Sequence, residues 1–587
     1  MHPYFPQISS NVLLLLRDMV LRLKRFGKAA AAEASSASPI TEREDDAAVR
    51  SKIPELKCGA NLLNLMGVFA ISVMAVSLVF SLSVVVRDPP ADAFWKVSEA
   101  RNLDFDLQKD KLPDEDLARK IKENPLGDLL ATGFDKKSCR SRFESALYNR
   151  GLSKKASPRL ISRLRSYEAL HKKCGPYTYS YNKTLENLKL GRHPSTPECN
   201  YVVWISMGGL GNRILTLTST FLYALLTDRV LLVDRRAGIS DLFCEPFPDT
   251  SWLLPEDFPL TSQFGRFDKN SNVSYGNMLG SDKTRLAMEQ YVYVHLAHDY
   301  GDRDKLFFCN QDHLVKIPWL IVKSDNYFAP FLFLTPGFEH ELHGLFPNKE
   351  SIFHLLGRYL LHPTNSVWGL ITRYYRAYLS KADVKVGIQV RVFDPRQGPL
   401  KHVLDQILSC VAKENILPKI SERDGVDVPG KGKTVAVLVT SLIAAYYEEV
   451  RNMYWEHATE SGEVVGVYQP SHEGFQQTGK HWHDRKAWAE MYLLGMMDKL
   501  VTSSWSTFGY VAQGVGGVRP WILTKAENGT VPEVVCSRAE SMEPCFHAPP
   551  YYDCRTGRGA DMRGLVPYVR HCEDVSWGLK LVDIHQE

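Results

Sequence analysis

The segment 201–234 places the strongest restriction on how this chain of 587 residues can fold. It contains a short apolar strand (YVVWIS, 201–206), a glycine turn (208–212), a helix (213–226) and a second strand (RVLLVD, 229–234). A strand that is followed by a helix and another strand normally builds a parallel sheet with helices on its faces. We therefore predict an α/β fold with a ligand site at the carboxyl ends of the strands.

A second series of strands and helices begins at residue 384. We expect strands at 384–393, 434–440, 463–468 and 499–503, and helices at 400–412, 484–497 and from 507 onward. Ser441 is a candidate N-cap for a further helix that reaches Tyr454. The two series together predict two Rossmann-type units with a cleft between them.

Residues 62–86 form a long apolar run without a charged side chain. At about 1.5 Å per residue, a helix of this length can cross a hydrocarbon core of about 30 Å. The run begins too far from the N-terminus to be a cleaved signal peptide, and the basic residues before it favour a cytosolic N-terminus. We predict a cytosolic and largely disordered tail (1–61), a transmembrane signal anchor (62–86) and a stem (87–124).

The charge balance disfavours a nucleic-acid-binding protein, and the cysteines favour a region that lies in an oxidising compartment. With 71 basic and 67 acidic residues the net charge is only +4, so the chain lacks the basic footprint of a nucleic-acid-binding protein. Of the eleven cysteines, Cys58 precedes the apolar run and ten follow it, an even number that suits disulfide bonds in an oxidising lumen. Glycosylation sequons at Asn182, Asn272 and Asn528 also predict a lumenal C-terminal region.

The glycine turn GLGNR (209–213) has two possible interpretations. It resembles a dinucleotide-binding fingerprint, but Ile214 stands where the third glycine should be, which disfavours an NAD-linked enzyme. What remains is either a plain tight turn or a helix N-terminus whose free N–H groups attract an anion.

Asp-x-Asp triplets, which hold a divalent ion in many glycosyltransferases, occur at 104–106, 114–116 and 302–304. The first two fall in the predicted stem, and the third is offset from the end of a strand-like run. We interpret all three as solvated charge.

Arg391 and the segment SSWSTFG (503–509) are better candidates for a binding site. Arg391 lies near the carboxyl end of an apolar strand, where a guanidinium needs an anionic partner. That partner is either an internal carboxylate or a ligand diphosphate, which a bidentate fork can hold. The segment 503–509 follows a strand and opens a helix, so it suits a phosphate, an N-cap or both.

Five stretches of the sequence resemble the plant xyloglucan α-1,2-fucosyltransferase family. They are GGLGNRILTLTSTFLYALLTDRVLLVD (208–234), KSDNYF (323–328), VGIQVRVFD (386–394), HDRKAWAEMYLLGMMDKLVTSSWSTFGYVAQGVGG (483–517) and the tail that begins MEPCFHAPPYYDC (542–554). The resemblance covers roughly residues 125–582. It implies a GT-B-like fold, GDP-fucose as donor, inversion at the anomeric carbon, no metal cofactor and a single-pass type II anchor in the Golgi membrane.

The resemblance also implies roles for individual residues. Arg391 corresponds to an arginine that binds the donor diphosphate, and Asp325 to a residue proposed as the catalytic base, with a water-mediated transfer as the family's other option. We expect the donor to be held by Gly209, Asn212, Arg213, Gln389, Arg391, His483, Asp484, Ser506, Thr507, Phe508 and Gly509.

The expected organisation is an acceptor-side domain (125–383), a GDP-fucose-binding domain (384–535) and a Cys-rich segment (536–587) that packs back on the catalytic unit. The acceptor is expected to be a galactosyl residue of a cell-wall polysaccharide such as xyloglucan, with arabinogalactan protein glycans as an alternative. A non-catalytic scaffold for other Golgi enzymes is an alternative of another class, and a homodimer or a complex with such enzymes also remains open.

Overall fold

The computed structural model describes residues 126–148, 155–192, 197–281, 288–309, 311–394, 399–421, 432–525 and 530–584. All of them belong to one compact unit, 109–587. The predicted tail, transmembrane segment and stem lie outside the described residues. Within the described part of the chain, no helix is both long and apolar enough to cross a membrane.

The first sheet is fully parallel and has the strand order β2-β1-β4-β3. Its strands are β1 (Asn200–Ile205), β2 (Arg229–Val233), β3 (Tyr291–Leu296) and β4 (Trp319–Ser324). The helices of this part of the chain are α4 (Arg140–Glu144), α5 (Pro158–Cys174), α6 (Tyr179–Leu190), α7 (Leu210–Thr227), α8 (Tyr275–Ser281), α10 (Asp302–Lys305), α11 (Ala329–Leu332), α12 (Glu339–Leu345), α13 (Ile352–Leu360) and α14 (Asn365–Tyr374).

The second sheet has the order β10-β9-β8-β5-β6-β7, and every pair is parallel except β9 with β10. Its strands are β5 (Val384–Val390), β6 (Thr434–Ser441), β7 (Val464–Tyr468), β8 (Lys499–Ser503), β9 (Trp521–Leu523) and β10 (Cys536–Arg538). Its helices are α15 (Leu400–Lys413), α16 (Ala445–Glu456), α17 (His481–Gly495) and α18 (Thr507–Gly516). The predicted α/β fold with parallel sheets is confirmed.

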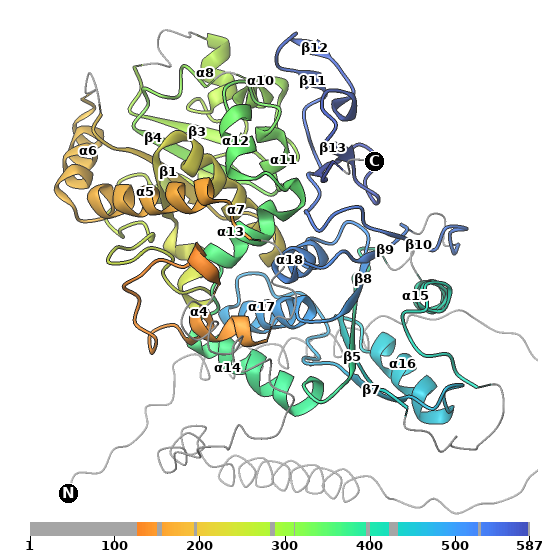
Figure 1. Cartoon of the computed structure of the whole chain (residues 1–587). Helices are drawn as coiled ribbons and strands as arrows, with labels where there is room; N and C mark the ends of the chain where they lie inside the picture. Colours follow the sequence, from red (N-terminus) through yellow and green to blue (C-terminus); the bar gives the residue numbers. More distant parts are fainter. Residues whose placement is uncertain are drawn as a thin grey trace, which may run out of the picture. The chain divides into compact units, whose positions relative to one another are not determined.

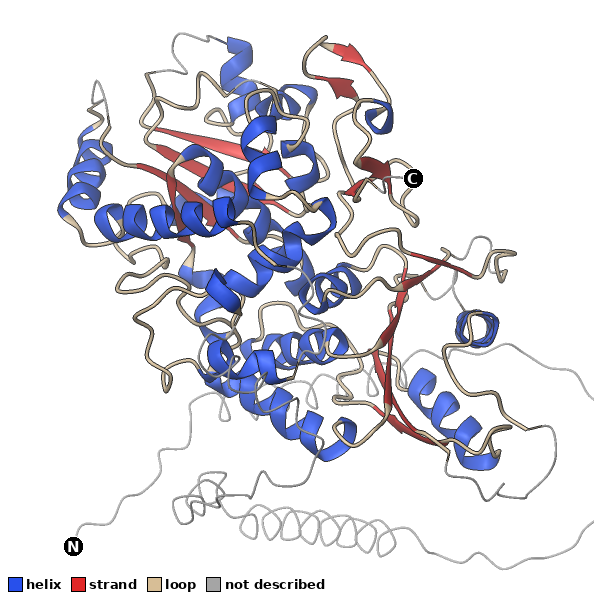
Figure 2. Ribbon diagram, viewed as in Figure 1, coloured by secondary structure: helices blue, strands red, loops and turns tan. Residues whose placement is uncertain are grey.

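Helices cover both faces of the second sheet, with α15 and α16 on one side and α17 and α18 on the other (Figures 1 and 2). Alternating residues of β5 explain this, because Val386, Ile388 and Val390 pack in the core shared with α15 and α16. Gly387 points the other way, where an added Cβ would stand 2.9 Å from Leu494 of α17. The absence of a side chain at Gly387 therefore lets α17 lie close to the sheet.

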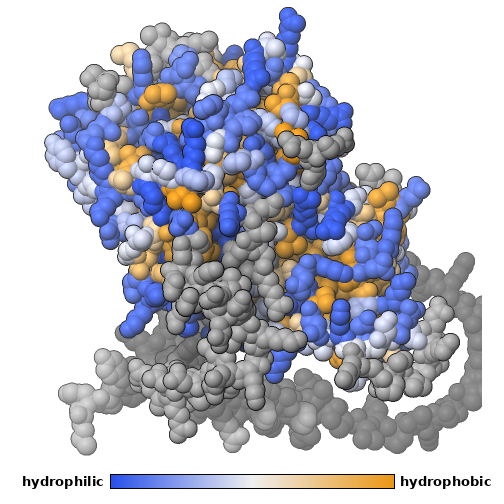
Figure 3. Space-filling view, viewed as in Figure 1, coloured by the Kyte–Doolittle hydropathy of each residue, from blue (hydrophilic) through white to orange (hydrophobic). Residues whose placement is uncertain are grey.

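The main hydrophobic core joins the two sheets into one unit. It contains residues of α5, α7, α13 and α14 from the first half together with residues of α17 and α18 from the second. A separate core packs α6 and the segment 254–267 on the other face of the first sheet. Hydrophilic residues cover most of the visible face of the described part (Figure 3).

All ten cysteines after residue 58 form disulfide bonds, which confirms the prediction from their even number. The pairs are Cys139–Cys244, Cys174–Cys199, Cys309–Cys554, Cys410–Cys536 and Cys545–Cys572. The C-terminal segment also contains two small antiparallel pairs, β11 (Tyr552–Asp553) with β12 (Arg558–Gly559) and β13 (Val569–His571) with β14 (Leu579–Leu581).

The bounds of several predicted elements differ from the structure. The helices α7 and α17 both begin three residues earlier than expected, at Leu210 and His481. The helix expected to begin at Ser441 begins at Ala445, because Ser441 ends β6 and its hydroxyl accepts the N–H of Ile443 at 3.1 Å instead. The strand expected at 384–393 ends at Val390. The N–H of Arg391 donates to the hydroxyl of Ser503 at 2.9 Å, so the backbone ladder stops one residue before the arginine.

Candidate functional site

The site lies where the switch points of the two sheets meet. In each sheet the chain first adds strands on one side and then on the other, which opens a crevice at the carboxyl ends between β1 and β4 and between β5 and β8. A cavity of about 230 Å³ lies there, lined by α7 (Leu210–Arg213), the end of β5, the end of β6, the loop after β7, α17 and the start of α18.

A close approach of α7 and α18 fixes the floor of this cavity. A Cβ on Gly211 would stand 2.6 Å from the hydroxyl of Thr507 and 2.8 Å from its carbonyl carbon, so only glycine fits. The hydroxyl of Thr507 donates to the side-chain oxygen of Asn212 at 3.0 Å, and the amide of Asn212 donates to the carbonyl of Asp325 at 2.9 Å. The segments that follow β1, β4 and β8 are thereby hydrogen-bonded to one another.

The start of α18 offers a site for an anion. Ser506 is its N-cap and accepts the N–H of Gly509 at 3.5 Å, and Ser506, Thr507 and Phe508 line the cavity. Free N–H groups and the helix dipole favour negative charge at such an end. The N-cap and the anion site are therefore compatible, as the sequence allowed.

Arg391 faces the same cavity. Its guanidinium donates to the side-chain oxygen of Gln476 at 3.1 Å and lies 5.1 Å from the ring centre of Phe393. In the described part of the chain no carboxylate pairs with it, so the internal salt bridge that the sequence allowed is not found there. Burial lowers the pKa of Arg391, because it removes part of the water that stabilises the cation. An anionic ligand between Arg391 and α18 would supply the missing partner.

Two buried polar atoms in the wall have no hydrogen-bond partner among the described residues. They are the side-chain oxygen of Gln389 and the hydroxyl of Thr440, and both residues are only 3 % exposed. Buried polar atoms are normally satisfied, and an unsatisfied one costs about 1–3 kcal/mol. Because both residues line the cavity, they are suited to contact a polar ligand.

Arg213 and Asp484 lie in the wall but hold each other. Their side chains are 6 % and 8 % exposed, and the guanidinium donates to the carboxylate at 2.7 Å. Its second nitrogen donates to the carbonyl of Ala237 at 2.9 Å. Since Arg213 belongs to α7 and Asp484 to α17, this ion pair connects the two halves of the site.

Asp325 lies outside the cavity lining, just after β4. Its carboxylate accepts the backbone N–H of His298 at 2.9 Å and the side-chain amide of Asn326 at 2.7 Å, and it also contacts the ring of His298. The side chain of Asp325 is 12 % exposed and that of His298 is 68 % exposed. The hydrogen bond that the His298 ring makes to the Asp325 carboxylate raises the pKa of His298, so this exposed ring is an ionisable group beside the crevice.

Glu490 is a buried carboxyl in the wall of the cavity, on α17. Burial raises its pKa to about 7, although the hydroxyl of Ser471 donates to it and opposes the rise. A carboxyl with a raised folded-state pKa favours folding most below its unfolded-state pKa, near 4.5, and this contribution disappears as the pH rises through 7.

We expect Glu490→Gln to remove this pH dependence. Between pH 5 and pH 8.5 the unfolding free energy of the unchanged protein should fall by roughly 2–3 kcal/mol relative to that of the variant. Urea unfolding of both proteins, followed by tryptophan fluorescence, measures the difference at each pH. If the unfolding free energies of the two proteins changed in parallel with pH across this range, the raised pKa of Glu490 would be contradicted.

The structure brings most of the predicted site residues together. All of the predicted donor residues except Gly509 line the cavity. Gly509 packs behind it, where an added Cβ would stand 2.9 Å from Thr502. Of the predicted glycosylation sites, Asn182 on α6 and Asn272 are exposed, and Asn528 lies outside the described residues.

Several residues of the site were missed from the sequence. They are Thr440, Ser441, Leu442, Ser471, Glu473, Gln476, Thr478, Glu490 and Met491 in the cavity wall, and His298 beside Asp325. Glu490 had a detectable signal, because it is an acidic residue within the apolar run AWAEMYLLGMM (487–497). The loop residues 471–478 had none, since only the fold returns that loop to the end of β5.

The interpretation of the triplet 302–304 as solvated charge is wrong for Asp304. Its side chain is buried and accepts the N–H groups of Gly276 and Gly301, both at 3.1 Å, so it caps α10. The other two triplets lie outside the described residues. No group of three or more potential metal ligands occurs among the residues that the structure describes.

Comparisons with known proteins agree with one another. A family model described as xyloglucan fucosyltransferase matches residues 97–555. The chain is similar to a galactoside 2-alpha-L-fucosyltransferase of Pisum sativum, with 59 % identity over 531 residues, or 90 % of this chain and 94 % of the relative. A protein of the same description from Arabidopsis thaliana is 54 % identical over 530 residues, or 88 % and 92 % of the two chains.

A solved structure has the same fold. It is that of an arginine-to-lysine mutant of Arabidopsis thaliana FUT1 in complex with GDP, with a TM-score of 0.73 and 57 % sequence identity. The match covers 78 % of this chain and 99 % of that one.

Proposed function

The chain belongs to the xyloglucan fucosyltransferase family, and from this we propose that it transfers L-fucose from GDP-fucose to O2 of a galactosyl residue of xyloglucan. It is a fucosyltransferase, as its relatives are. The observation that carries the donor assignment is Arg391, a half-buried cation that lines the same cavity as the N-terminus of α18 and has no carboxylate partner among the described residues. A diphosphate suits this pair of groups.

In the proposed mechanism GDP is the leaving group. As the bond between the fucose C1 and the β-phosphate oxygen breaks, negative charge grows on the phosphate and C1 becomes oxocarbenium-like. Arg391 and the N–H groups at Ser506–Phe508 would stabilise that charge, and such preorganised donors often contribute more to catalysis than any other single effect. Because they supply the positive charge that a metal ion would otherwise supply, we propose a metal-independent reaction.

The acceptor hydroxyl would attack C1 from the face opposite to GDP, which inverts the anomeric carbon. Its proton would pass to Asp325, directly or through water. Asp325 is bound through its carbonyl to Asn212, and Asn212 through its side chain to Thr507. This chain of contacts supports a role for Asp325 near the fucose, next to the anion site.

We propose the GT-B organisation for the two sheets and the crevice between them. The N-terminal half (125–383) would face the acceptor, the C-terminal half (384–535) would bind the donor, and the Cys-rich segment (536–587) would support both. We further propose a type II Golgi enzyme anchored by residues 62–86. Five disulfide bonds and the exposed sequons at Asn182 and Asn272 support a lumenal catalytic region.

Labelled GDP-fucose offered to the full chain with a panel of acceptors tests this function. We expect label on galactosylated xyloglucan oligosaccharides, little on arabinogalactan chains, and an unchanged rate when EDTA is added. Preferred transfer to arabinogalactan chains would show that they, and not xyloglucan, are the acceptor. GDP binding without transfer to any acceptor would instead support a scaffold, and loss of activity in EDTA that Mn²⁺ restores would contradict the metal-independent mechanism.

A further inference from the structure

Trp505 has an unusual backbone conformation next to the residues that form the anion site. It lies between β8 and α18, one residue before the N-cap Ser506, and its φ is 61°. A non-glycine residue in this left-handed region costs about 1–3 kcal/mol and persists only where its surroundings hold it. The conformation turns the chain so that α18 begins at the cavity.

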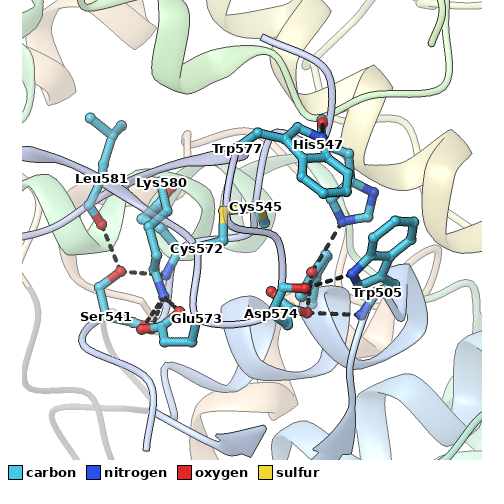
Figure 4. The surroundings of a disulfide bond; sticks show 12 residues. Trp505, Ser541, Cys545, His547, Cys572, Glu573, Asp574, Trp577, Lys580 and Leu581 are labelled. Atoms are coloured by element: carbon cyan, nitrogen blue, oxygen red, sulfur yellow. Dashed lines mark hydrogen bonds and ion pairs between the residues drawn. A yellow bond between two sulfur atoms is a disulfide. The ribbon is translucent and has the colours of Figure 1, made fainter. Parts of the chain in front are cut away.

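Asp574 holds Trp505 at two points. The backbone N–H of Trp505 donates to the Asp574 carboxylate at 2.8 Å, and the indole N–H donates to the Asp574 carbonyl at 2.5 Å (Figure 4). The hydroxyl of Tyr510, one turn into α18, donates to the same carboxylate oxygen at 2.6 Å. One carboxylate thus binds both the strained residue and the helix that follows it.

The C-terminal segment holds Asp574 in turn. Asp574 lies two residues after Cys572, which forms a disulfide bond with Cys545, and within the connection between β13 and β14. The neighbouring Glu573 pairs with the buried Lys580 at 2.8 Å, and Trp577 packs edge-on against the Trp505 ring at 5.5 Å (Figure 4). Asp574 is therefore presented by a small cross-linked structure that itself does not line the cavity.

The loop that contains Trp505 carries the other contacts of the site. Ser503 accepts the N–H of Arg391, and Thr507 donates to Asn212. A displacement of Trp505 would therefore move Arg391 relative to the first N–H groups of α18. We propose that Asp574 is a positioning residue for donor binding, through which the C-terminal segment sets the geometry of the diphosphate site. This inference rests on the proposed function of that site as the GDP-fucose site.

Asp574→Asn in the full chain tests the proposal, because it keeps the size of the side chain but weakens its acceptor. We expect the Kd for GDP and the KM for GDP-fucose to rise about tenfold, the effect of losing one charge-assisted hydrogen bond that orders the loop. The KM for the acceptor should stay within about twofold. Calorimetry with GDP and initial rates with both substrates give these values.

Glu573→Gln is the matched control, since it removes an adjacent charge of the same segment without touching Trp505. It should lower the melting temperature and leave the Kd for GDP unchanged. Asp574→Glu, which keeps the charge, should bind GDP with an affinity between those of the unchanged chain and Asp574→Asn. If Asp574→Asn does not fold, Asp574→Glu takes its place in the test.

The proposal is overturned if Asp574→Asn binds GDP as the unchanged chain does, or if Glu573→Gln weakens GDP binding equally. A failure of the unchanged chain to bind GDP would instead contradict the proposed function of the site, so the two failures are distinguishable.

Discussion

Replacing Arg391 with alanine or lysine is expected to lower the transfer rate by about a hundredfold or more, because the loss of one charge-assisted contact in a water-poor site commonly costs about 2.7–4 kcal/mol in the transition state. Lysine keeps the charge but not the fork that can hold two phosphate oxygens at once. Both variants should fold, since no described carboxylate depends on Arg391 for its charge balance.

Initial rates with labelled GDP-fucose and calorimetry with GDP measure the effect. Arg140→Lys is the matched control, because Arg140 pairs with Glu144 on the surface, where its side chain is 60 % exposed. That variant should transfer fucose at the unchanged rate. A folded Arg391→Ala protein with near-normal GDP affinity and transfer rate would contradict the assignment of the diphosphate site.

Asp484→Asn is expected to destabilise the fold by about 3–5 kcal/mol, because it leaves the Arg213 guanidinium buried without its carboxylate. The two side chains are 6 % and 8 % exposed and belong to helices from different halves of the molecule. The loss should therefore loosen the contact between α7 and α17, and with it the cavity.

Urea unfolding monitored by tryptophan fluorescence gives the change in free energy. Asp249→Asn supplies the control, since Asp249 pairs with Lys172 at 2.9 Å but both side chains are more than 60 % exposed. Asparagine also tolerates the φ of 57° at this position, so a change below about 1 kcal/mol is expected. Equal effects of the two substitutions would show that Arg213 does not need a buried counter-ion.

The local pattern of the sequence was enough to predict the parallel α/β units. Apolar runs and glycine turns report directly on strands and their ends, and they placed β8 at Lys499–Ser503 as the structure has it. The end of a strand was harder to predict where a side chain, and not a neighbouring strand, accepts a backbone N–H group. The hydroxyl of Ser503 does this for the N–H of Arg391. Arg391 could still be identified as a candidate site residue, because an arginine after an apolar strand is unusual whatever its neighbours in space are.

The partners of the site residues could not be predicted in the same way. Arg213 and Asp484 were both expected to bind the donor, but they are 271 residues apart in the sequence and meet as an ion pair only in the folded chain. Trp505 and Asp574 are separated by 69 residues and belong to different segments. Nothing in the composition of either segment shows that one holds the other.

The position of GDP in a structure of the full chain tests the central claim most directly. We predict that the diphosphate bridges the Arg391 guanidinium and the N–H groups at Ser506–Phe508, with the nucleoside against Gln389 and Thr440. A diphosphate that touches neither Arg391 nor the start of α18, or GDP bound outside this cavity, would contradict it.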